Sequence, residues 1–288
     1  MAETSVRFTN LEKELWPKSG VSKGELVAYL DAVRHAVLPH LRERPLSVIR
    51  FHGEDDRGFF QKDLPKYAPD WVKSVRMYAP SAKRHVRYPL CNDRRTLLWF
   101  ANQRAVELHA ALARRDKPDR PTDLVLDIDP PAGAFDRAAE VARLLRAVLA
   151  DLGLAARLKT SGGKGLHVIV PLRRTHTFDD VRAASLAVAH RAEQRAPDLV
   201  TTEISKKKRG GRVLIDWTRS QPAQTLIAPL SPRGRPGLPV SFPVAWDELS
   251  SVDPRDFTIA TVPRIVGDGD PWTELSPPPQ SLPRTLTA

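Results

Sequence analysis

The chain has 288 residues, with 45 lysines and arginines against 34 aspartates and glutamates, which leaves a net charge of +11. A positive field of this size favours polyanionic partners, and nucleic acid is the leading candidate. No apolar run approaches the roughly 18 residues of a membrane-spanning helix, and a single cysteine, Cys91, excludes both an internal disulfide and a thiolate zinc cluster. Without the apolar core of a secretory signal at its start, the sequence predicts a protein of the reducing cytoplasm.

The first predicted element is a helix near the N-terminus. Ser22 and Glu25 have the spacing of a capping box, in which two side chains satisfy backbone donors at the start of a helix. The box predicts a helix over about residues 23–37, and Pro39 is expected to end it.

The most informative run is Asp123-Leu-Val-Leu-Asp-Ile-Asp-Pro130, which predicts a strand. Side chains on a strand alternate between its faces, so the leucines and the isoleucine enter a core while Asp127 and Asp129 project together from the other face. Two carboxylates held that close repel unless a cation neutralises them, and all-oxygen sites favour Mg²⁺ or Mn²⁺. The alternative is a turn, a strand end or a solvated pair, the more frequent context of an isolated Asp-x-Asp.

Helices and strands alternate after this run, which predicts an α/β fold. The expected elements are a helix from Asp136 to Leu152, strands around Ala155 to Thr160 and from Leu166 to Leu172, a helix from about Phe178 to Arg195, and a strand over Arg212–Trp217. The last strand ends near a third carboxylate, Asp216. If it lies beside the strand of Asp127 and Asp129, the three carboxylates could hold a two-metal pair for phosphoryl transfer.

A glycine-rich turn, Ser161-Gly-Gly-Lys-Gly-Leu-His167, separates two of these strands. Its glycines allow close approach of a ligand, and Lys164 offers a cation, so phosphate is the expected guest. The spacing and the missing Lys-Ser/Thr pair exclude a Walker A loop. A plain hairpin turn remains the alternative.

These motifs resemble, in order and spacing, those of the archaeo-eukaryotic primase superfamily. Over about residues 5–273 the chain is similar to the polymerase domain of bacterial DNA ligase D, in the segments Asn10–Pro17, Lys23, Arg44-Pro45, Arg50, Phe59–Lys62, Glu107–His109, Arg209–Arg212, Ser231-x-Arg233 and Pro239–Ser241. The resemblance implies a primase-like α/β core of mixed sheets flanked by helices, with an N-terminal α/β extension. A single domain is expected over residues 1–275, with a DNA-binding part at about 1–75, a catalytic core at about 76–275 and a disordered, proline-rich tail at 276–288.

The resemblance also implies a reaction, namely template-dependent addition of nucleotides, preferentially ribonucleotides, to a DNA primer at short gaps or broken ends with a 5′-phosphate. Asp127, Asp129 and Asp216 would bind two divalent metal ions, commonly Mn²⁺, and Asp216 would also assist the primer hydroxyl. The incoming nucleoside triphosphate would be held by Ser161, Lys164, His167 and Arg233, with Arg50 and His109 in the same pocket.

On the DNA side, the resemblance assigns Asn10, Lys13 and Lys23 to the downstream 5′-phosphate. It assigns Phe59 and Phe60 to stacking on the template. Lys206 and Arg209, the ends of the basic run Lys206–Arg209, are assigned to binding the template or the primer. The residues alone leave other interpretations open. The lysines could be solvated surface residues, the phenylalanines core residues, and the basic run a solvated hairpin.

Two segments depart from the family's pattern. Trp217-Thr-Arg-Ser220 stands where the family often has an asparagine, and Met77–Tyr88 corresponds to a variable loop that helps to join two broken ends. No Lys-x-Asp-Gly adenylation motif occurs, so the chain is not expected to seal nicks itself. It is either a freestanding polymerase, which the Met1 start and the short proline-rich tail favour, or an excised domain of a ligase. A DNA ligase or the Ku end-binding protein is the expected protein partner, and the expected location is the cytoplasm at the nucleoid. Two other classes remain open: a non-catalytic module that brings DNA ends or a ligase together, and a metal-dependent nuclease.

Overall fold

The structure, a computed structural model, describes residues 6–51 and 57–286 of the chain. The chain forms two units: the first comprises residues up to 111 with 225–241 and 255–271, and the second comprises 112–224, 242–254 and the residues from 272. The expected boundary near residue 75 differs from this division, because later segments add strands to the sheet of the first unit. Within the described ranges, no helix is both long and apolar enough to cross a membrane.

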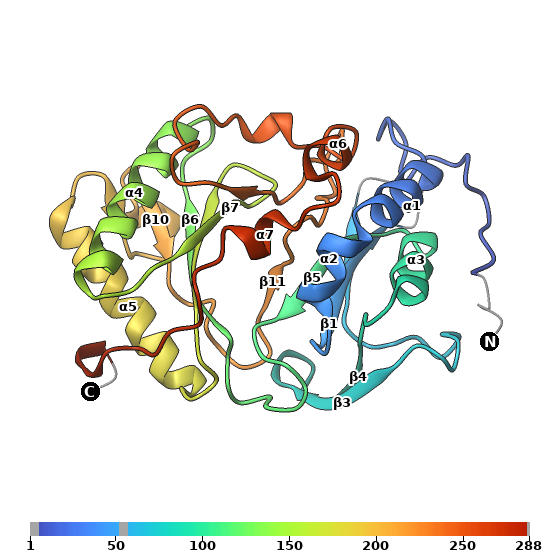
Figure 1. The fold of residues 1–288 in the computed structure, drawn as a ribbon, viewed down its shortest axis with the longest axis horizontal. Coiled ribbons are helices and arrows are strands. Elements are labelled where there is room, and N and C mark those ends of the chain that lie inside the picture. Colours follow the sequence, from blue (N-terminus) through green and yellow to red (C-terminus); the bar gives the residue numbers. More distant parts are fainter. Residues whose placement is uncertain (1–5, 52–56, 287–288) are drawn as a thin grey trace. The chain divides into compact units, whose positions relative to one another are not determined.

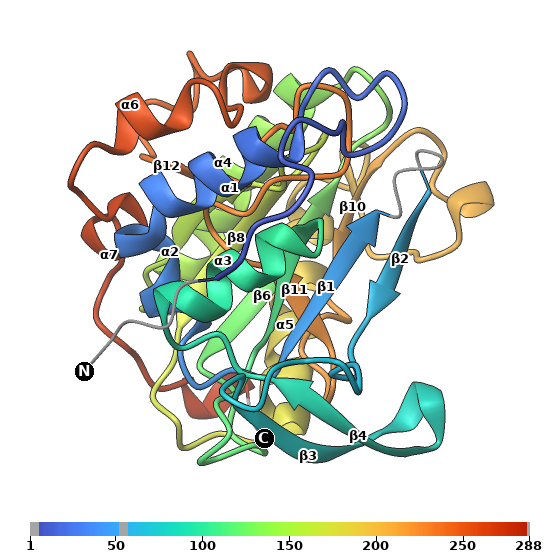
Figure 2. The same cartoon turned by 90° about the vertical axis from the view of Figure 1, so that its right-hand side faces the viewer.

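The first unit is built on a four-stranded antiparallel sheet in the order β11-β5-β1-β2. Its strands are β1 (Leu46–Phe51), β2 (Gly58–Gln61), β5 (Ala105–Ala111) and β11 (Thr225–Ile227). Three helices pack together beside this sheet, namely α1 (Lys23–Ala32), α2 (Arg34–Leu41) and α3 (Arg94–Asn102) (Figure 2). The short helix α6 (Val262–Val266) belongs to the same unit. The 3-10 turn Pro254–Asp256 lies at the boundary, with its last two residues in the first unit.

The N-terminal helix begins as the sequence predicts but ends earlier. The Oγ of Ser22 accepts from the backbone N–H of Glu25 (3.2 Å), and Glu25 Oε2 accepts from the N–H of Ser22 (2.7 Å). The helix then breaks at Val33, and Pro39 lies inside the second helix instead of ending the first. In an eight-residue helix, Pro39 costs one intrahelical hydrogen bond near the C-terminal end, which does not prevent the helix from forming.

The segment expected as a variable loop is a β-hairpin. β3 (Ser74–Ala79) pairs with β4 (Arg84–Pro89) around the 3-10 turn Pro80–Ala82. Arg76 lies directly opposite Arg87, so the pairing concentrates positive charge on the ribbon. A small cluster of Ala79, Val86 and Tyr88 supports it.

The second unit contains a six-stranded mixed sheet in the order β12-β7-β8-β6-β10-β9, and it confirms the expected α/β fold class. The strands are β6 (Asp123–Asp129), β7 (Arg157–Thr160), β8 (Leu166–Pro171), β9 (Val200–Thr201), β10 (Val213–Asp216) and β12 (Pro243–Val244). The helices α4 (Phe135–Asp151) and α5 (Phe178–Arg195) run side by side along this sheet (Figure 1). As predicted, Leu124, Leu126 and Ile128 are fully buried, whereas Asp127 and Asp129 are half-buried.

The C-terminal segment was expected to be disordered, and this expectation is wrong for the described residues. After the short helix α7 (Pro271–Glu274), Gln280 forms a bridge with Leu172, and its side-chain amide bonds both backbone groups of Ala155 at 2.8 Å. Leu282 is buried, and the 3-10 turn Arg284–Leu286 follows. Prolines prevent a helix or a continuous ladder here, but Gln280 keeps its own N–H and a side chain that can bond a neighbouring strand.

Candidate active site

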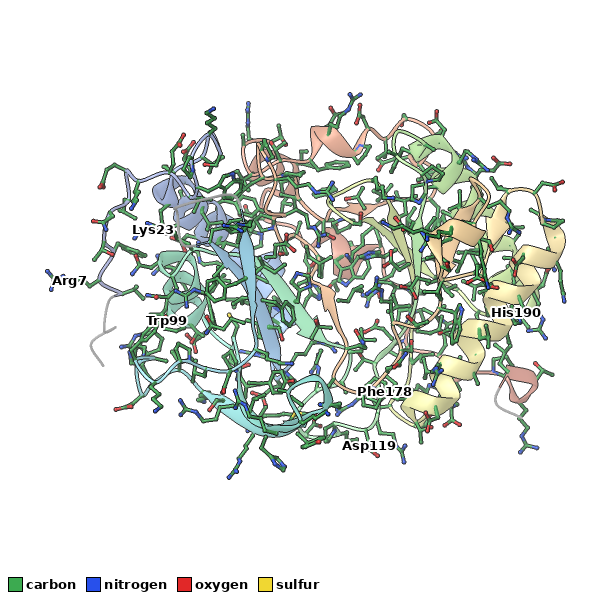
Figure 3. The ribbon with its side chains drawn as sticks, turned by 180° about the vertical axis from the view of Figure 1, so that it is seen from behind. Arg7, Lys23, Trp99, Asp119, Phe178 and His190 are labelled. Atoms are coloured by element: carbon green, nitrogen blue, oxygen red, sulfur yellow. The ribbon has the colours of Figure 1, made fainter. Side chains whose placement is uncertain are left out.

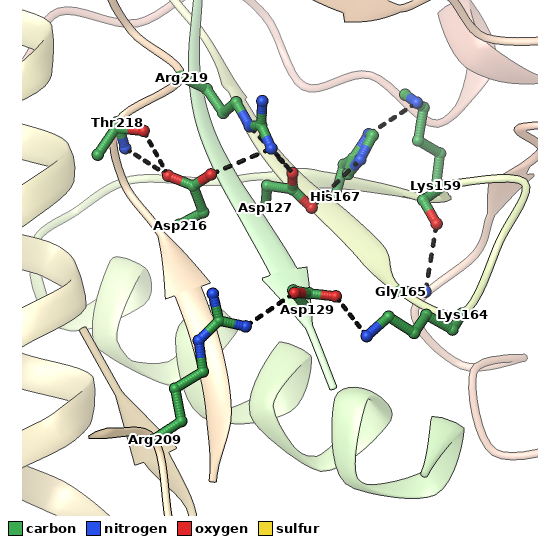
Figure 4. A network of polar contacts seen from close by, with 11 residues as sticks. Asp127, Asp129, Lys159, Lys164, Gly165, His167, Arg209, Asp216, Thr218 and Arg219 are labelled. Carbon is green, nitrogen blue, oxygen red and sulfur yellow. Dashed lines mark hydrogen bonds and ion pairs between the residues drawn. The ribbon is translucent and has the colours of Figure 1, made fainter. Parts of the chain in front are cut away.

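Four polar residues form one row across four neighbouring strands of the second unit. Lys159 on β7 pairs with His167 on β8, and His167 pairs in turn with Asp127 on β6. Asp216 on β10 is the partner of Asp127. Directly paired residues project from the same face of a sheet, so the two carboxylates lie side by side, the arrangement that a shared metal site requires (Figure 4).

Side-chain cations neutralise all three carboxylates. The Nη2 of Arg219 lies 3.0 Å from Asp127 Oδ2 and 3.1 Å from Asp216 Oδ2, so one guanidinium bridges both groups. On the other side, Asp129 contacts Lys164 Nζ at 2.8 Å and Arg209 Nη1 at 3.0 Å. The site therefore attracts positive charge in two places, between Asp127 and Asp216 and beside Asp129 (Figure 4).

The surroundings keep Asp127 ionised and His167 neutral. Burial lowers the pKa of His167 to about 4, and the ammonium of Lys159 acts in the same direction. Burial alone would raise the pKa of Asp127, but the interaction with His167 and the charges of Arg219 and Lys159 outweigh it and hold the pKa below its usual range. A carboxylate that stays ionised at neutral pH is available to a cation.

The carboxylates fit a hard divalent cation in chemistry. Among the residues that the structure describes, no group of three or more His, Cys, Asp or Glu side chains is arranged as a metal site. Asp127 and Asp216 nevertheless present adjacent oxygens from paired strands, and the Arg219 guanidinium lies between them. A metal ion bound by this pair would take over the charge balance that Arg219 supplies.

The glycine-rich turn joins β7 to β8 and contacts the end of β6. Ser161 Oγ accepts from the N–H groups of Gly163 and Gly165, both at 3.2 Å. A Cβ on Gly165 would lie 2.1 Å from the carbonyl oxygen of Ile128, so only glycine fits there. The ammonium of Lys164 donates to the carbonyl of Pro130 (2.6 Å) beside Asp129.

A second cluster of predicted residues lies in the first unit. The buried carboxylate of Glu107 on β5 accepts from His109 Nε2 (2.8 Å), Arg233 Nη1 (3.0 Å) and the backbone N–H of Gly234 (2.9 Å). His109 and Arg233, both expected in the nucleotide pocket, are thus brought together by a residue to which no role was assigned. The alternation of Glu107 and His109 on one face of a strand was the available sequence signal.

The other expected pocket residue, Arg50, is held by protein groups. Its Nε donates to the carbonyl of Gln103 (2.8 Å), and its Nη1 donates to Gln61 Oε1 (2.7 Å) and Tyr67 Oη (2.8 Å). The guanidinium also lies 5.5 Å from the centre of the Phe59 ring. The structure therefore joins Arg50 to the Phe59 strand, rather than to the Glu107 cluster.

The three residues expected at a 5′-phosphate are neighbours. The N–H of Lys13 bonds the carbonyl of Asn10 (3.3 Å), and the N–H of Lys23 bonds the carbonyl of Lys13 (2.9 Å). Lys23, labelled in Figure 3, begins α1. It is only 3% exposed and donates to Thr9 Oγ1 (3.3 Å), so it is not a solvated surface lysine. Burial, and then the charge of Arg104, lowers its pKa.

Of the remaining residues expected to bind DNA, some are exposed to solvent and Arg209 is bound by other protein groups. Phe60 is 52% exposed and meets His109 edge to face, which excludes a core position, while Phe59 is half-buried. Lys206 lies on an exposed 3-10 turn, Lys206–Lys208. Arg209 instead turns its guanidinium to Asp129 and to the carbonyl of Ile204.

Comparisons with known proteins agree on one family. Residues 22–272 match the family model described as LigD, primase-polymerase domain. The chain is 35% identical over 254 residues to the multifunctional non-homologous end joining protein LigD of Mycolicibacterium smegmatis, covering 87% of this chain and 33% of that protein. It is 34% identical over 283 residues to the bifunctional non-homologous end joining protein LigD of Bacillus subtilis, covering 96% and 45%.

A solved structure extends this similarity to three dimensions. The polymerase domain from Mycobacterium tuberculosis ligase D in complex with DNA has a TM-score of 0.86 and 35% identity to this chain, covering 95% of it and 98% of that domain. The chain spans less than half the length of the two curated relatives.

The Glu107 cluster predicts a pH-dependent stability difference. Burial raises the pKa of Glu107, but His109, Arg233 and the N–H of Gly234 lower it by more, to below its usual 4.5. The ionised carboxylate therefore stabilises the fold above that value, and the stabilisation is lost as pH falls through the folded-state pKa. Glu107→Gln should lower the free energy of unfolding by about 2 kcal/mol at pH 7, and the deficit should shrink between about pH 5 and pH 3.

Urea denaturation at a series of pH values measures this difference, with Glu140→Gln on the exposed side of α4 as the control. The control should unfold like the wild type throughout. A deficit for Glu107→Gln that grows in acid would contradict the assigned contacts.

Proposed function

Because the chain belongs to the LigD primase-polymerase domain family, and with it to the nucleotidyltransferases of the primase-polymerase type, we propose that it extends a DNA primer along a template at short gaps or broken ends carrying a 5′-phosphate. The biological setting would be break end joining or excision-repair gap filling. The solved relative's complex with DNA and the net charge of +11 both support a DNA substrate.

The pairing of Asp127 with Asp216, with Asp129 two residues along the same strand, is the observation that carries this proposal. We assign these carboxylates as the groups that hold two divalent ions, Mn²⁺ or Mg²⁺. Such ions would align the attacking and leaving oxygens of phosphoryl transfer. Asp216 is also assigned to assist the primer hydroxyl.

We assign phosphate-binding groups within each unit separately. In the second unit, Lys164 is 44% exposed in its side chain, so it can exchange Asp129 for a phosphate oxygen, beside Ser161 and His167. In the first unit, His109 and Arg233 share Glu107, and they supply a ring nitrogen and further guanidinium donors. Arg50 is assigned to the same pocket by family resemblance alone.

The DNA contacts rest on exposure and grouping. Asn10, Lys13 and Lys23 lie together, which supports a shared 5′-phosphate. The exposed ring of Phe60 and the exposed Lys206 support contacts to bases and backbone, respectively. Phe59 and Arg209 are assigned to the same contacts by family resemblance alone. We extend the proposal to a DNA ligase or an end-binding protein as partner, since the curated relatives are end-joining proteins.

The first prediction of the proposal concerns catalysis. With Mn²⁺, the wild type should extend a primer on gapped DNA, several-fold more efficiently with ribonucleotides than with deoxyribonucleotides, which corresponds to about 1 kcal/mol from a contact to the 2′-hydroxyl. Asp129→Ala should extend with neither sugar, while binding the DNA as tightly as the wild type or more tightly. Primer-extension gels and fluorescence anisotropy measure the two properties.

The same assay separates the alternative classes. A wild-type protein that binds DNA ends but adds no nucleotide would be an end-binding module. Shortening of labelled DNA in the absence of nucleotides would indicate a nuclease. Extension by Asp129→Ala at the wild-type rate would remove the two-metal assignment.

The second prediction concerns the DNA end. Gapped DNA with a downstream 5′-phosphate should bind about tenfold more tightly than the same DNA with a 5′-hydroxyl, since a charge-assisted contact to one phosphate is worth this much. Lys13→Ala with Lys23→Met should erase most of the difference, methionine being chosen to fill the buried position of Lys23.

A charge-matched control is Lys66→Ala with Lys117→Met, since both lysines are exposed and neither is assigned to the 5′-phosphate. This control should lose general affinity without losing the preference for the phosphate. Equal binding of the two DNAs by the intact protein would refute the 5′-phosphate assignment and leave the polymerase assignment standing.

A further inference from the structure

Lys159 is a buried lysine to which neither the family resemblance nor the proposed reaction assigns a role. Its side chain has 0% exposure, although an ammonium group is among the most costly to remove from water. It lies on β7 directly opposite His167 on β8, and its Nζ is 2.9 Å from the Nδ1 of His167. The ammonium group of Lys159 therefore acts directly on the imidazole of His167.

The contact determines where the imidazole carries its hydrogen. An ammonium group has three donors and no acceptor, so Nδ1 must be the unprotonated nitrogen that accepts. In a neutral ring, the hydrogen then resides on Nε2. That nitrogen lies 3.4 Å from Asp127 Oδ1, so the N–H faces the carboxylates (Figure 4).

We propose that Lys159 is a positioning residue, which holds His167 in the Nε2–H tautomer with a fixed ring orientation and so presents a neutral donor to a triphosphate oxygen. Without Lys159, the proton could move to Nδ1 or the ring could turn over. The proton shift would direct a lone pair at an anionic phosphate, and the turned ring would present a C–H in place of the Nε2–H donor. The ligand in this inference rests on the proposed function, but the tautomer does not.

Nuclear magnetic resonance of the wild-type protein tests the tautomer directly. Long-range proton–nitrogen spectra distinguish a protonated ring nitrogen from an unprotonated one, and the His167 signals are assigned by their loss in His167→Gln. In the protein without nucleotide or metal, Nδ1 of His167 should be unprotonated and Nε2 protonated. A proton on Nδ1 would overturn the proposal without any variant of Lys159 having to fold.

Two matched variants then separate positioning from stabilisation. Lys159→Met removes the donor and keeps the volume, so His167 should show a mixture of tautomers. Calorimetry should show ATP with Mn²⁺ binding about fivefold more weakly, the loss of one oriented hydrogen bond. The thermal midpoint should stay the same or rise, because a buried cation has been replaced by an apolar group.

Arg157→Met is the control, since Arg157 lies two residues earlier on β7 and pairs with Asp123 at 2.7 Å. It should lower the thermal midpoint and leave both the His167 tautomer and ATP binding unchanged. Wild-type ATP binding by Lys159→Met, with His167 still in the Nε2–H form, would also overturn the proposal. If the wild type bound no ATP at all, the proposed function would fail, while the spectra of the wild type would still decide the tautomer.

Discussion

The arrangement of the candidate site depends on the pairing register of four strands. β7, β8, β6 and β10 align so that Lys159, His167, Asp127 and Asp216 occupy one row on one face of the sheet. A slip of one residue at any of these pairings would send a member of the row to the opposite face. The register is protected there by fully buried apolar residues, such as Leu126 and Ile128, and by the close approach of Gly165 to β6.

The charges around this row follow one principle. Three carboxylates gathered on a chain of net charge +11 attract positive groups, and Arg219, Arg209 and Lys164 occupy those positions. A metal ion would replace side-chain cations with a smaller and more strongly charged partner. The arginines and lysine that it releases would then be free for phosphate groups, so the same residues can serve the site without metal and the site with substrate.

The sequence predicted the elements whose signal is local. Alternation placed Asp127 and Asp129 on one face, and α5 begins and ends where its amphipathic pattern does, at Phe178 and Arg195. Contacts between distant segments had no such signal. Arg209 meets Asp129 across 80 residues of chain, and Glu107 reaches Gly234 across 127, so neither pairing follows from spacing. The contacts of the C-terminal segment were missed as well. Its proline content indicates that a helix or a strand ladder is impossible, but it does not predict a single contact such as that between Gln280 and Ala155.

The central claim is that the register between β6 and β10 creates a divalent-metal site, and direct Mn²⁺ binding tests it. Electron paramagnetic resonance of free Mn²⁺ during titration gives the affinity without nucleotide or DNA. Asp216→Asn should bind Mn²⁺ at least about tenfold more weakly than the wild type, since it loses one charged ligand. Asp123→Asn, which changes a carboxylate on the same strand that is paired with Arg157, should bind Mn²⁺ like the wild type. Equal Mn²⁺ affinity of Asp216→Asn and the wild type would contradict the account.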